Sequence, residues 1–185
     1  IEESNIYTDL LREFSHHGHN IYLVSAIERK HNKASKYSHF ANVYQLQVKI
    51  GNITQCGVIE KGISTILIEK QFIRAIKKYV SAKIDLVMCP TPPVTFAKVV
   101  EFIKKRDKAQ SYLLLKDIFP QNAVDMCMLS KTGIKGLIYK HFRKQEKRLY
   151  SISDRIGCMS QANVDYVINH NSEVDPKIVE ICPNC

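Results

Sequence analysis

Residues 85–120 read DLVMCPTPPVTFAKVVEFIKKRDKAQSYLLLKDIFP, and this stretch decides the fold. Its apolar runs at 85–89 and 112–115 have the length and composition of buried strands. Between the runs, apolar residues recur at helical spacing from Phe96 to Ile103, ahead of a basic stretch. A strand, a helix and a second strand in this order predict two parallel strands joined by a crossover helix.

Helices and strands alternate through the rest of the chain as well. We predict helices at 4–17, 65–80, 134–150 and 161–170, and further strands at 21–24, 43–50, 155–159 and 177–182. Gly18 is placed to end the first helix. Pro90 is placed to end the strand 85–89. The polar stretch 28–42 is expected to form a loop. The first helix and its following strand are the second half of a βαβ unit, so we expect that unit's first strand to be missing. The alternation indicates an α/β, Rossmann-like fold with a mostly parallel sheet and helices on both faces.

The composition bounds the class of protein. With 185 residues, 45% of them hydrophobic, the chain can bury the core of one domain. No apolar run approaches the roughly 18 residues of a membrane span, and no secretory leader is recognisable. Six cysteines do not form a dense disulfide framework, so we expect a cytoplasmic protein. The net charge of +9 is compatible with nucleic acid, an anionic membrane surface or a phosphate-bearing ligand.

Sequence motifs for cofactors and metals are absent or incomplete. The chain contains no GxGxxG and no Walker A sequence, so NAD-dependent redox chemistry and P-loop hydrolysis are unsupported. Residues 182–185 (CPNC) form a CxxC pair without the second ligand pair of a zinc knuckle. His16, His17 and His19 lack carboxylate or thiolate partners at a fixed spacing and suit the C-terminus of a helix. We therefore expect no metal and no cofactor, and we assign no catalytic residue.

The predicted helix 134–150 carries the most concentrated positive charge, and Glu146 is its only acid. Its basic face suits solvent, or an anionic bilayer to which each basic residue is attracted. Nucleic acid is the weakest candidate, because no stacking sheet or recognition motif accompanies the charge, and we expect no nucleic-acid partner. If the helix lies on a membrane, the residues expected to face it are Lys140, Arg143, Lys144, Lys147 and Arg148.

Candidate ligand-contacting residues follow three of the predicted strands. Thr91 and Pro92 follow the first, Lys116 and Asp117 the second, and Ser160 the third. In open parallel sheets, ligands bind where the carboxyl ends of the strands converge. We therefore expect these residues to line a ligand-binding cleft. For Lys116 and Asp117, a surface loop with an ion pair is the alternative.

Five segments carry a resemblance to a known family. They are 7–14 with 17–19, 85–87 with 91–93, 113–123, 156–160 with Asn163, and 179–184. Taken in order they resemble the glycosyltransferase family 4 enzymes, which have the GT-B fold. The segment 113–123 (LLLKDIFPQNA) is the most specific, because it is similar to the loop after strand five in bacterial capsule and O-antigen members. The family's glycine-containing loop before the first helix is lacking, and Cys185 stands where the family commonly has a small residue.

The resemblance implies that residues 1–185 form the N-terminal, acceptor-side half of a retaining enzyme of surface-polysaccharide biosynthesis, without its C-terminal donor-binding domain. Such an enzyme moves a sugar from a nucleotide-sugar, here expected to be a UDP-sugar, to a lipid-linked saccharide, usually without a metal. It works in the cytoplasm, peripherally attached to the anionic inner face of the inner membrane. The acceptor-binding residues implied are Thr91, Pro92, Lys116, Asp117, Ser160 and Asn163. The alternative is a non-catalytic α/β binding module that uses the basic helix to engage a partner or a membrane; the sugar, acceptor and linkage are not assigned.

Overall fold

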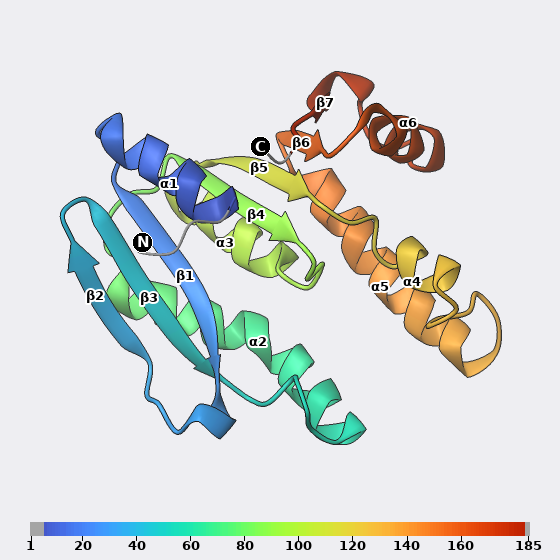
Figure 1. Ribbon diagram of the computed structural model, residues 1–185, viewed down its shortest axis with the longest axis horizontal. Helices are drawn as coiled ribbons and strands as arrows, with labels where there is room; N and C mark the ends of the chain where they lie inside the picture. Colours follow the sequence, from blue (N-terminus) through green and yellow to red (C-terminus); the bar gives the residue numbers. More distant parts are fainter. Residues whose placement is uncertain (1–5, 184–185) are drawn as a thin grey trace. The chain divides into compact units, whose positions relative to one another are not determined.

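The computed structural model describes residues 6–183, and its strands form two separate sheets in two compact units (Figure 1). The first unit ends at Ala82 and the second begins at Lys83. The α/β, Rossmann-like class predicted from the sequence is confirmed, because helices flank a sheet of parallel strands. No helix in the described range has the length and apolar character needed to cross a bilayer.

Between residues 6 and 82, the first unit contains three strands and two α-helices. Its elements are α1 (Ile6–His16), β1 (Ile21–Glu28), a 3₁₀ turn (Arg29–His31), β2 (Lys36–Phe40), β3 (Val43–Ile50) and α2 (Val58–Tyr79). The strand order is β1-β3-β2, with β1 parallel and β2 antiparallel to β3. Gly18 ends α1 at a φ of 82°, as predicted.

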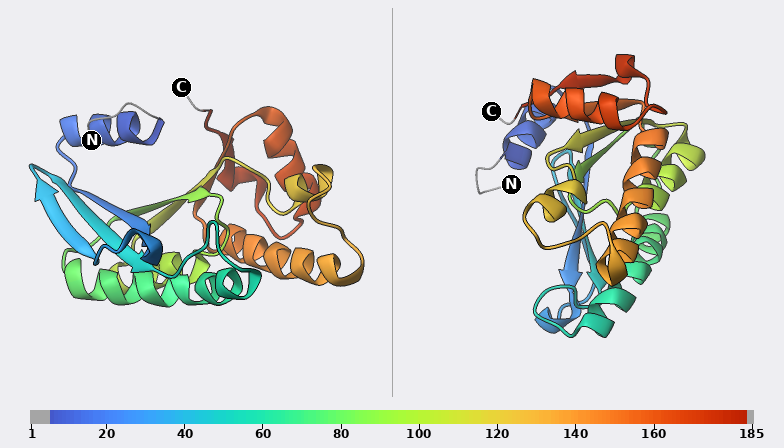
Figure 2. Two further views of the ribbon diagram at one scale, coloured as in Figure 1. Left: turned by 60° about the horizontal axis from the view of Figure 1, so that its bottom comes forward. Right: turned by 90° about the vertical axis from the view of Figure 1, so that its right-hand side faces the viewer.

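Alternation along β3 explains how this sheet is covered. Leu46, Val48 and Ile50 are buried and point to one face, whereas Lys49 between them is exposed. α2 packs against β3, and α1 and α2 lie on opposite sides of the sheet (Figure 2). The tyrosine rings of Tyr22 and Tyr44 stack at 4.6 Å between the paired strands β1 and β3.

Two expectations for the first unit are wrong. The stretch 28–42 is not a loop, because it includes the end of β1 and all of β2. β2 is an edge strand with exposed Lys36, His39 and Phe40, so its sequence lacks the apolar character of a buried strand. α2 also begins at Val58 rather than residue 65, because its first turns expose apolar residues that do not repeat the pattern of a buried face.

The second unit holds an all-parallel sheet in the order β4-β5-β6-β7. Its elements are β4 (Leu86–Thr91), α3 (Ala97–Asp107), β5 (Gln110–Leu115), α4 (Gln121–Asp125), α5 (Gly133–Ile152), β6 (Arg155–Cys158), α6 (Gln161–His170), a 3₁₀ turn (Pro176–Ile178) and β7 (Val179–Ile181). Thr91, Leu115 and Cys158 are paired across neighbouring strands. β4, β5 and β6 therefore end together, and we call this side of the sheet the carboxyl edge.

One core supports the second unit. Its buried side chains include Leu113 and Leu115 of β5, Ile156 and Cys158 of β6, Ala97 of α3, Leu149 of α5, Val167 of α6 and Val179 of β7. Burial raises the pKa of the Cys158 thiol to about 11, so at neutral pH this residue is an apolar core side chain rather than a thiolate.

Two strand ends differ from the sequence expectation. Pro90 does not end β4, which continues to Thr91. β4 pairs only with β5, and an edge strand tolerates a residue without an amide hydrogen. The last predicted strand, 177–182, is shorter, because residues up to Ile178 belong to a 3₁₀ turn and β7 covers Val179–Ile181.

Candidate functional site

The carboxyl edge brings Thr91 and the 116–117 segment together. Thr91 is 2% exposed, and its hydroxyl lies 3.4 Å from the carbonyl oxygens of both Leu114 and Asp117, to which it can donate. The same oxygen accepts a hydrogen bond of 3.2 Å from the backbone amide of Lys116. Thr91 therefore holds the loop after β5 against the end of β4. It acts as a positioning residue and not as an exposed ligand contact.

The side chains available at this edge are those of Pro92 and Asp117, both exposed, and Lys116, which is half-buried. Because the Thr91 hydroxyl holds the backbone of residues 116 and 117, the Asp117 carboxylate is presented from a defined turn. An ionised carboxylate accepts hydrogen bonds, and a lysine ammonium donates them. Together they suit a ligand rich in hydroxyl groups.

Ser160 and Asn163 lie at the start of α6, just beyond the end of β6. The Ser160 hydroxyl accepts a hydrogen bond of 3.4 Å from the backbone amide of Asn163. The Asn163 side-chain oxygen lies 3.4 Å from the same hydroxyl. This is the geometry of a helix N-cap, which satisfies a backbone donor that has no partner inside the helix. The structure thus shows a local structural role for both residues.

α4 adds two polar side chains that the sequence analysis did not assign. The Gln121 Oε1 and Asn122 Oδ1 oxygens are buried without a hydrogen-bond partner in the described residues. Gln121 Nε2 donates to the Asp125 carboxylate at 2.7 Å. Buried polar atoms without hydrogen-bond partners are uncommon. They occur where a functional role outweighs the cost of the missing hydrogen bond. Gln121 and Asn122 lie in segment 113–123, which carries the most specific family resemblance, but the sequence analysis assigned only Lys116 and Asp117 of that segment to the site.

The five residues expected to face a membrane fall into two groups. Lys140 and Lys144 are exposed on α5. The other three have partners within the unit: Arg143 with Glu146 at 2.6 Å, Lys147 with Glu173 at 2.8 Å, and Arg148 with Glu101 at 2.5 Å. A shallow depression of about 460 Å³ on α5 is lined by Lys144, Gln145, Lys147, Arg148, Ser151 and Glu173. It lies away from the carboxyl edge residues and is bordered by these ion pairs.

Arg143 is part of a buried polar network. Its guanidinium donates to Glu146 at 2.6 Å and to the Asn171 side-chain oxygen at 2.6 Å, while the Tyr150 hydroxyl donates to the Glu146 carboxylate at 2.7 Å. Burial raises the pKa of Glu146, against the opposing effects of the Tyr150 hydrogen bond and the Arg143 charge. Arg143 therefore joins α5 to the residue that ends α6.

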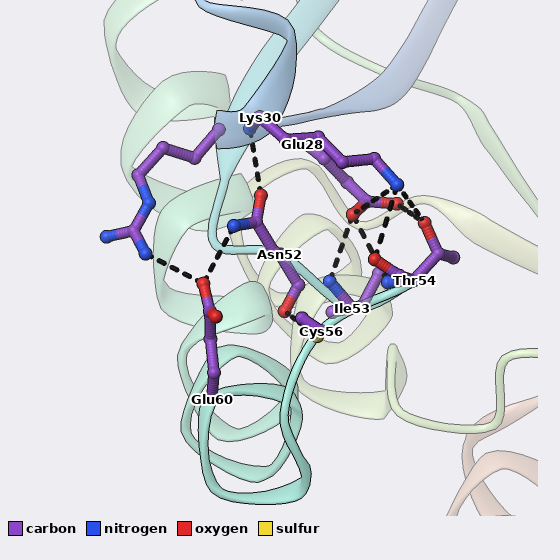
Figure 3. A network of polar contacts seen from close by, with 8 residues as sticks. Glu28, Lys30, Asn52, Ile53, Thr54, Cys56 and Glu60 are labelled. Carbon is purple, nitrogen blue, oxygen red and sulfur yellow. Dashed lines mark hydrogen bonds and ion pairs between the residues drawn. The ribbon is translucent and has the colours of Figure 1, made fainter.

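A second polar cluster lies in the first unit, where β1 and β3 end (Figure 3). The Glu28 carboxylate accepts hydrogen bonds from the Thr54 hydroxyl at 2.6 Å and from the amides of Ile53 and Thr54 at 3.1 and 3.2 Å. Lys30 lies 3.6 Å from the same carboxylate. These contacts, led by the Thr54 hydroxyl, lower the pKa of Glu28 to about 2.

The neighbouring contacts complete this cluster. Glu60 accepts hydrogen bonds of 2.7 Å from both Arg29 and Asn52, and the Asn52 oxygen accepts from the Lys30 amide at 2.8 Å (Figure 3). The donors and acceptors of this cluster hydrogen-bond to one another. The cluster therefore fixes the turn between β3 and α2. No sequence motif indicated it.

Metal-binding side chains do not gather in the part of the chain that the structure describes. No group of three or more His, Cys, Asp or Glu residues suited to an ion is found between residues 6 and 183. The His19 ring instead packs edge-on against Phe14 at 5.7 Å. Cys185, half of the CxxC pair, lies outside the described residues.

No protein-family model and no curated protein sequence matches the chain. Among solved structures, it is similar to one described as trehalose-6-phosphate from E. coli bound with UDP-2-fluoro glucose. The TM-score is 0.55 and the identity 9%, over 92% of this chain and 41% of that one. The present chain thus spans less than half the length of its structural neighbour. At this identity the likeness is one of fold, namely the Rossmann-like fold found in a GT-B enzyme.

Proposed function

We propose that the chain is the acceptor-side half of a GT-B glycosyltransferase that uses a nucleotide-sugar. The observation that carries the proposal is the fold similarity over 92% of the chain to a structure bound with UDP-2-fluoro glucose. The carboxyl edge of β4–β6 supports it, since ligands of open parallel sheets bind at that side. Fold alone does not fix function, so the exposed polar groups at the edge must supply the chemistry.

In this proposal Asp117 and Lys116 contact the acceptor or the transferred sugar. Asp117 accepts hydrogen bonds from sugar hydroxyls, and Lys116 donates them. Pro92 supplies an apolar contact beside them, while Thr91, Ser160 and Asn163 hold the surrounding backbone. A second domain binds the nucleotide, and transfer proceeds with retention at the anomeric carbon and without a metal.

We further propose that the acceptor is a lipid-linked saccharide, as in bacterial capsule and O-antigen synthesis by family 4 enzymes. The support is the resemblance of residues 113–123 to the loop after strand five in those enzymes. The protein would then work peripherally at the cytoplasmic face of the inner membrane.

A panel of UDP-sugars tests the transfer reaction. The full-length protein is incubated with each UDP-sugar and a lipid-linked saccharide acceptor, and UDP release is measured. The proposal predicts acceptor-dependent release with at least one donor. If no UDP-sugar binds or reacts, the rival function is favoured: a binding module without catalysis. The exposed apolar residues of α5 are the observation that supports this rival.

A further inference from the structure

Exposed apolar residues gather at one end of the second unit. Met126 and Met128, in the turn between α4 and α5, are 61% and 65% exposed. Ile134, Leu137 and Ile138, in the first two turns of α5, are 83%, 68% and 44% exposed. We call these five residues the apolar tip. Single exposed apolar residues are ordinary, but a contiguous group marks a surface that another body covers.

Hydrogen bonds and close packing give the apolar tip a defined shape. The amides of Met128 and Leu129 both donate to the Ala123 carbonyl at 2.9 Å. A Cβ at Gly136 would lie 2.6 Å from the Lys131 carbonyl oxygen, so this glycine lets the turn pack against α5. In Figures 1 and 2 the turn lies at the end of α5 that points away from the sheet of its unit. The apolar side chains of the tip are therefore exposed because the turn is held in a defined shape at this end of α5.

The charges around the apolar tip are mainly positive, and the exposed Asp125 directly before Met126 is the acid beside it. Residues 126–145 contain five Lys or Arg residues and no Asp or Glu. At about 100° per residue, the three apolar side chains of α5 fall within an arc of about 100°, with Lys135 on one side and Lys140 and Lys144 on the other. All three lysines are exposed. The surface is an apolar stripe with one ammonium group on one side and two on the other.

We propose that the apolar tip docks onto an anionic lipid bilayer, with Lys135, Lys140 and Lys144 at its headgroups. The Met, Ile and Leu side chains enter the acyl boundary, while long lysine side chains keep their charges at the interface. A protein partner fits less well, because protein interfaces are depleted in lysine and enriched in aromatic residues. The docking depends on this surface alone and not on the proposed transfer reaction.

The contact surface differs from the one expected from the sequence. Arg143, Lys147 and Arg148 engage Glu146, Glu173 and Glu101, and their charges are already balanced within the unit. The docking surface therefore moves to the N-terminal half of α5, of which only Gly136 is buried.

α2 supplies a matched control, because it also exposes isoleucines. Ile59 and Ile66 are 80% and 69% exposed on one helix face. The charges beside Ile59 have both signs, Glu60 and Lys61, so this face lacks the uniform attraction to an anionic surface. The control variant is Ile59→Ser with Ile66→Ser, and the test variant is Ile134→Ser with Leu137→Ser. The two variants remove similar amounts of exposed apolar surface.

Vesicle sedimentation tests the docking. The full-length protein is spun with vesicles of phosphatidylcholine alone or with 30% phosphatidylglycerol added, roughly the anionic content that attracts basic segments. We expect binding to the anionic vesicles only, and a loss on the order of tenfold in the Ile134→Ser/Leu137→Ser variant. The Ile59→Ser/Ile66→Ser control should bind like wild type. Loss of binding in the control alone, or in neither variant, overturns the proposal.

A charge variant separates specific docking from general attraction. Replacing Lys135, Lys140 and Lys144 by Ser is expected to weaken binding tenfold or more, whereas the same change at Lys33, Lys36 and Lys105 is not. Equal losses in both triple variants would show general attraction to the net charge and overturn the proposal. Circular dichroism confirms that each variant is folded. UDP release from a detergent-solubilised acceptor should be unchanged in the Ile134→Ser/Leu137→Ser variant, so failure of docking and failure of transfer are distinguishable.

Discussion

Thr91 shows how one hydroxyl can fix the geometry of a site that it does not itself line. The residue is 2% exposed and has three backbone partners within 3.4 Å, all at the end of β5 or just after it. The sequence analysis placed Thr91 after its strand and assigned it to ligand binding, whereas Thr91 is the last residue of β4. Its burial could not be read from the chain, because it depends on the pairing of β4 with β5.

Thr91→Val is therefore expected to destabilise the protein. The valine has a similar shape but removes the hydroxyl that donates to the Leu114 or Asp117 carbonyl and accepts from the Lys116 amide, which keeps only the Leu114 carbonyl as its acceptor. The free energy of unfolding should fall by about 1–3 kcal/mol in urea titrations. Thr91→Ser keeps the hydroxyl and should retain most of the stability. Equal losses in the two variants would contradict a role for the hydroxyl.

Glu28 makes acid stability testable at the residue scale. Its pKa is lowered from 4.5 to about 2 in the folded chain, so its ionised form stabilises the fold above pH 4.5. That contribution is lost as the pH falls from 4.5 towards 2. Glu28→Gln should therefore be less stable than wild type at pH 7, and the difference should shrink across this window.

Chemical unfolding at a series of pH values measures this difference. Glu13→Gln is the control, because the Glu13 side chain is 69% exposed and belongs to no buried network. A gap between wild type and Glu28→Gln that stays constant from pH 7 to pH 2 would contradict the assignment.

Among the elements, α5 combines two functions along its length. Its C-terminal half is anchored in the core by Leu149 and Tyr150, and its N-terminal half carries the apolar tip. Arg143 lies between the two and binds Glu146 and Asn171. Because Glu146 is 4% exposed at its side chain, loss of Arg143 would remove the cation that is paired with a buried carboxylate.

Arg143→Ser is expected to lower the free energy of unfolding by about 3–5 kcal/mol at pH 7. The loss should be smaller at pH 5, because protonation of Glu146 removes the buried charge and burial already raises its pKa. Adding Glu146→Gln to Arg143→Ser should recover part of the stability in thermal or urea melts. No recovery in the double variant would contradict the pairing.

Local patterns determined which elements could be predicted. β3 and α6 have the bounds expected from the sequence, because alternation in β3 and the Ser160 cap of α6 are signals within a few residues. β2 was missed because its polar edge sequence becomes a strand only through pairing with β3. The extension of β4 through Pro90 likewise depends on its edge position.

In the candidate site, too, the features set by local sequence could be predicted and those set by contacts between distant residues could not. The parallel order of the strands could be inferred, and with it the placement of Thr91, Lys116 and Asp117 at one edge. The ion pairs of α5 could not, since Arg148 and Glu101 are 47 residues apart. The Glu28–Thr54 cluster, which spans 26 residues, was invisible for the same reason.

At the scale of the whole molecule, we assign ligand binding and membrane contact to two different surfaces. The carboxyl edge of the second sheet presents Asp117 from a fixed turn, and the apolar tip at the start of α5 offers a lipid contact. The chain spans 41% of the length of the solved structure to which it is similar. In our proposal, Asp117 is the side chain of this chain on which sugar transfer depends most directly.

The decisive comparison uses two exposed aspartates that flank the same sheet. Asp117 follows β5 at the carboxyl edge, whereas Asp85 precedes β4 and its side chain is 90% exposed. Sugar transfer by the full-length protein should fall at least about tenfold in Asp117→Ala, the loss of one charged hydrogen bond, with an unchanged melting temperature. Asp85→Ala should transfer sugar like wild type. Normal transfer by folded Asp117→Ala would contradict the placement of the acceptor site at the carboxyl edge.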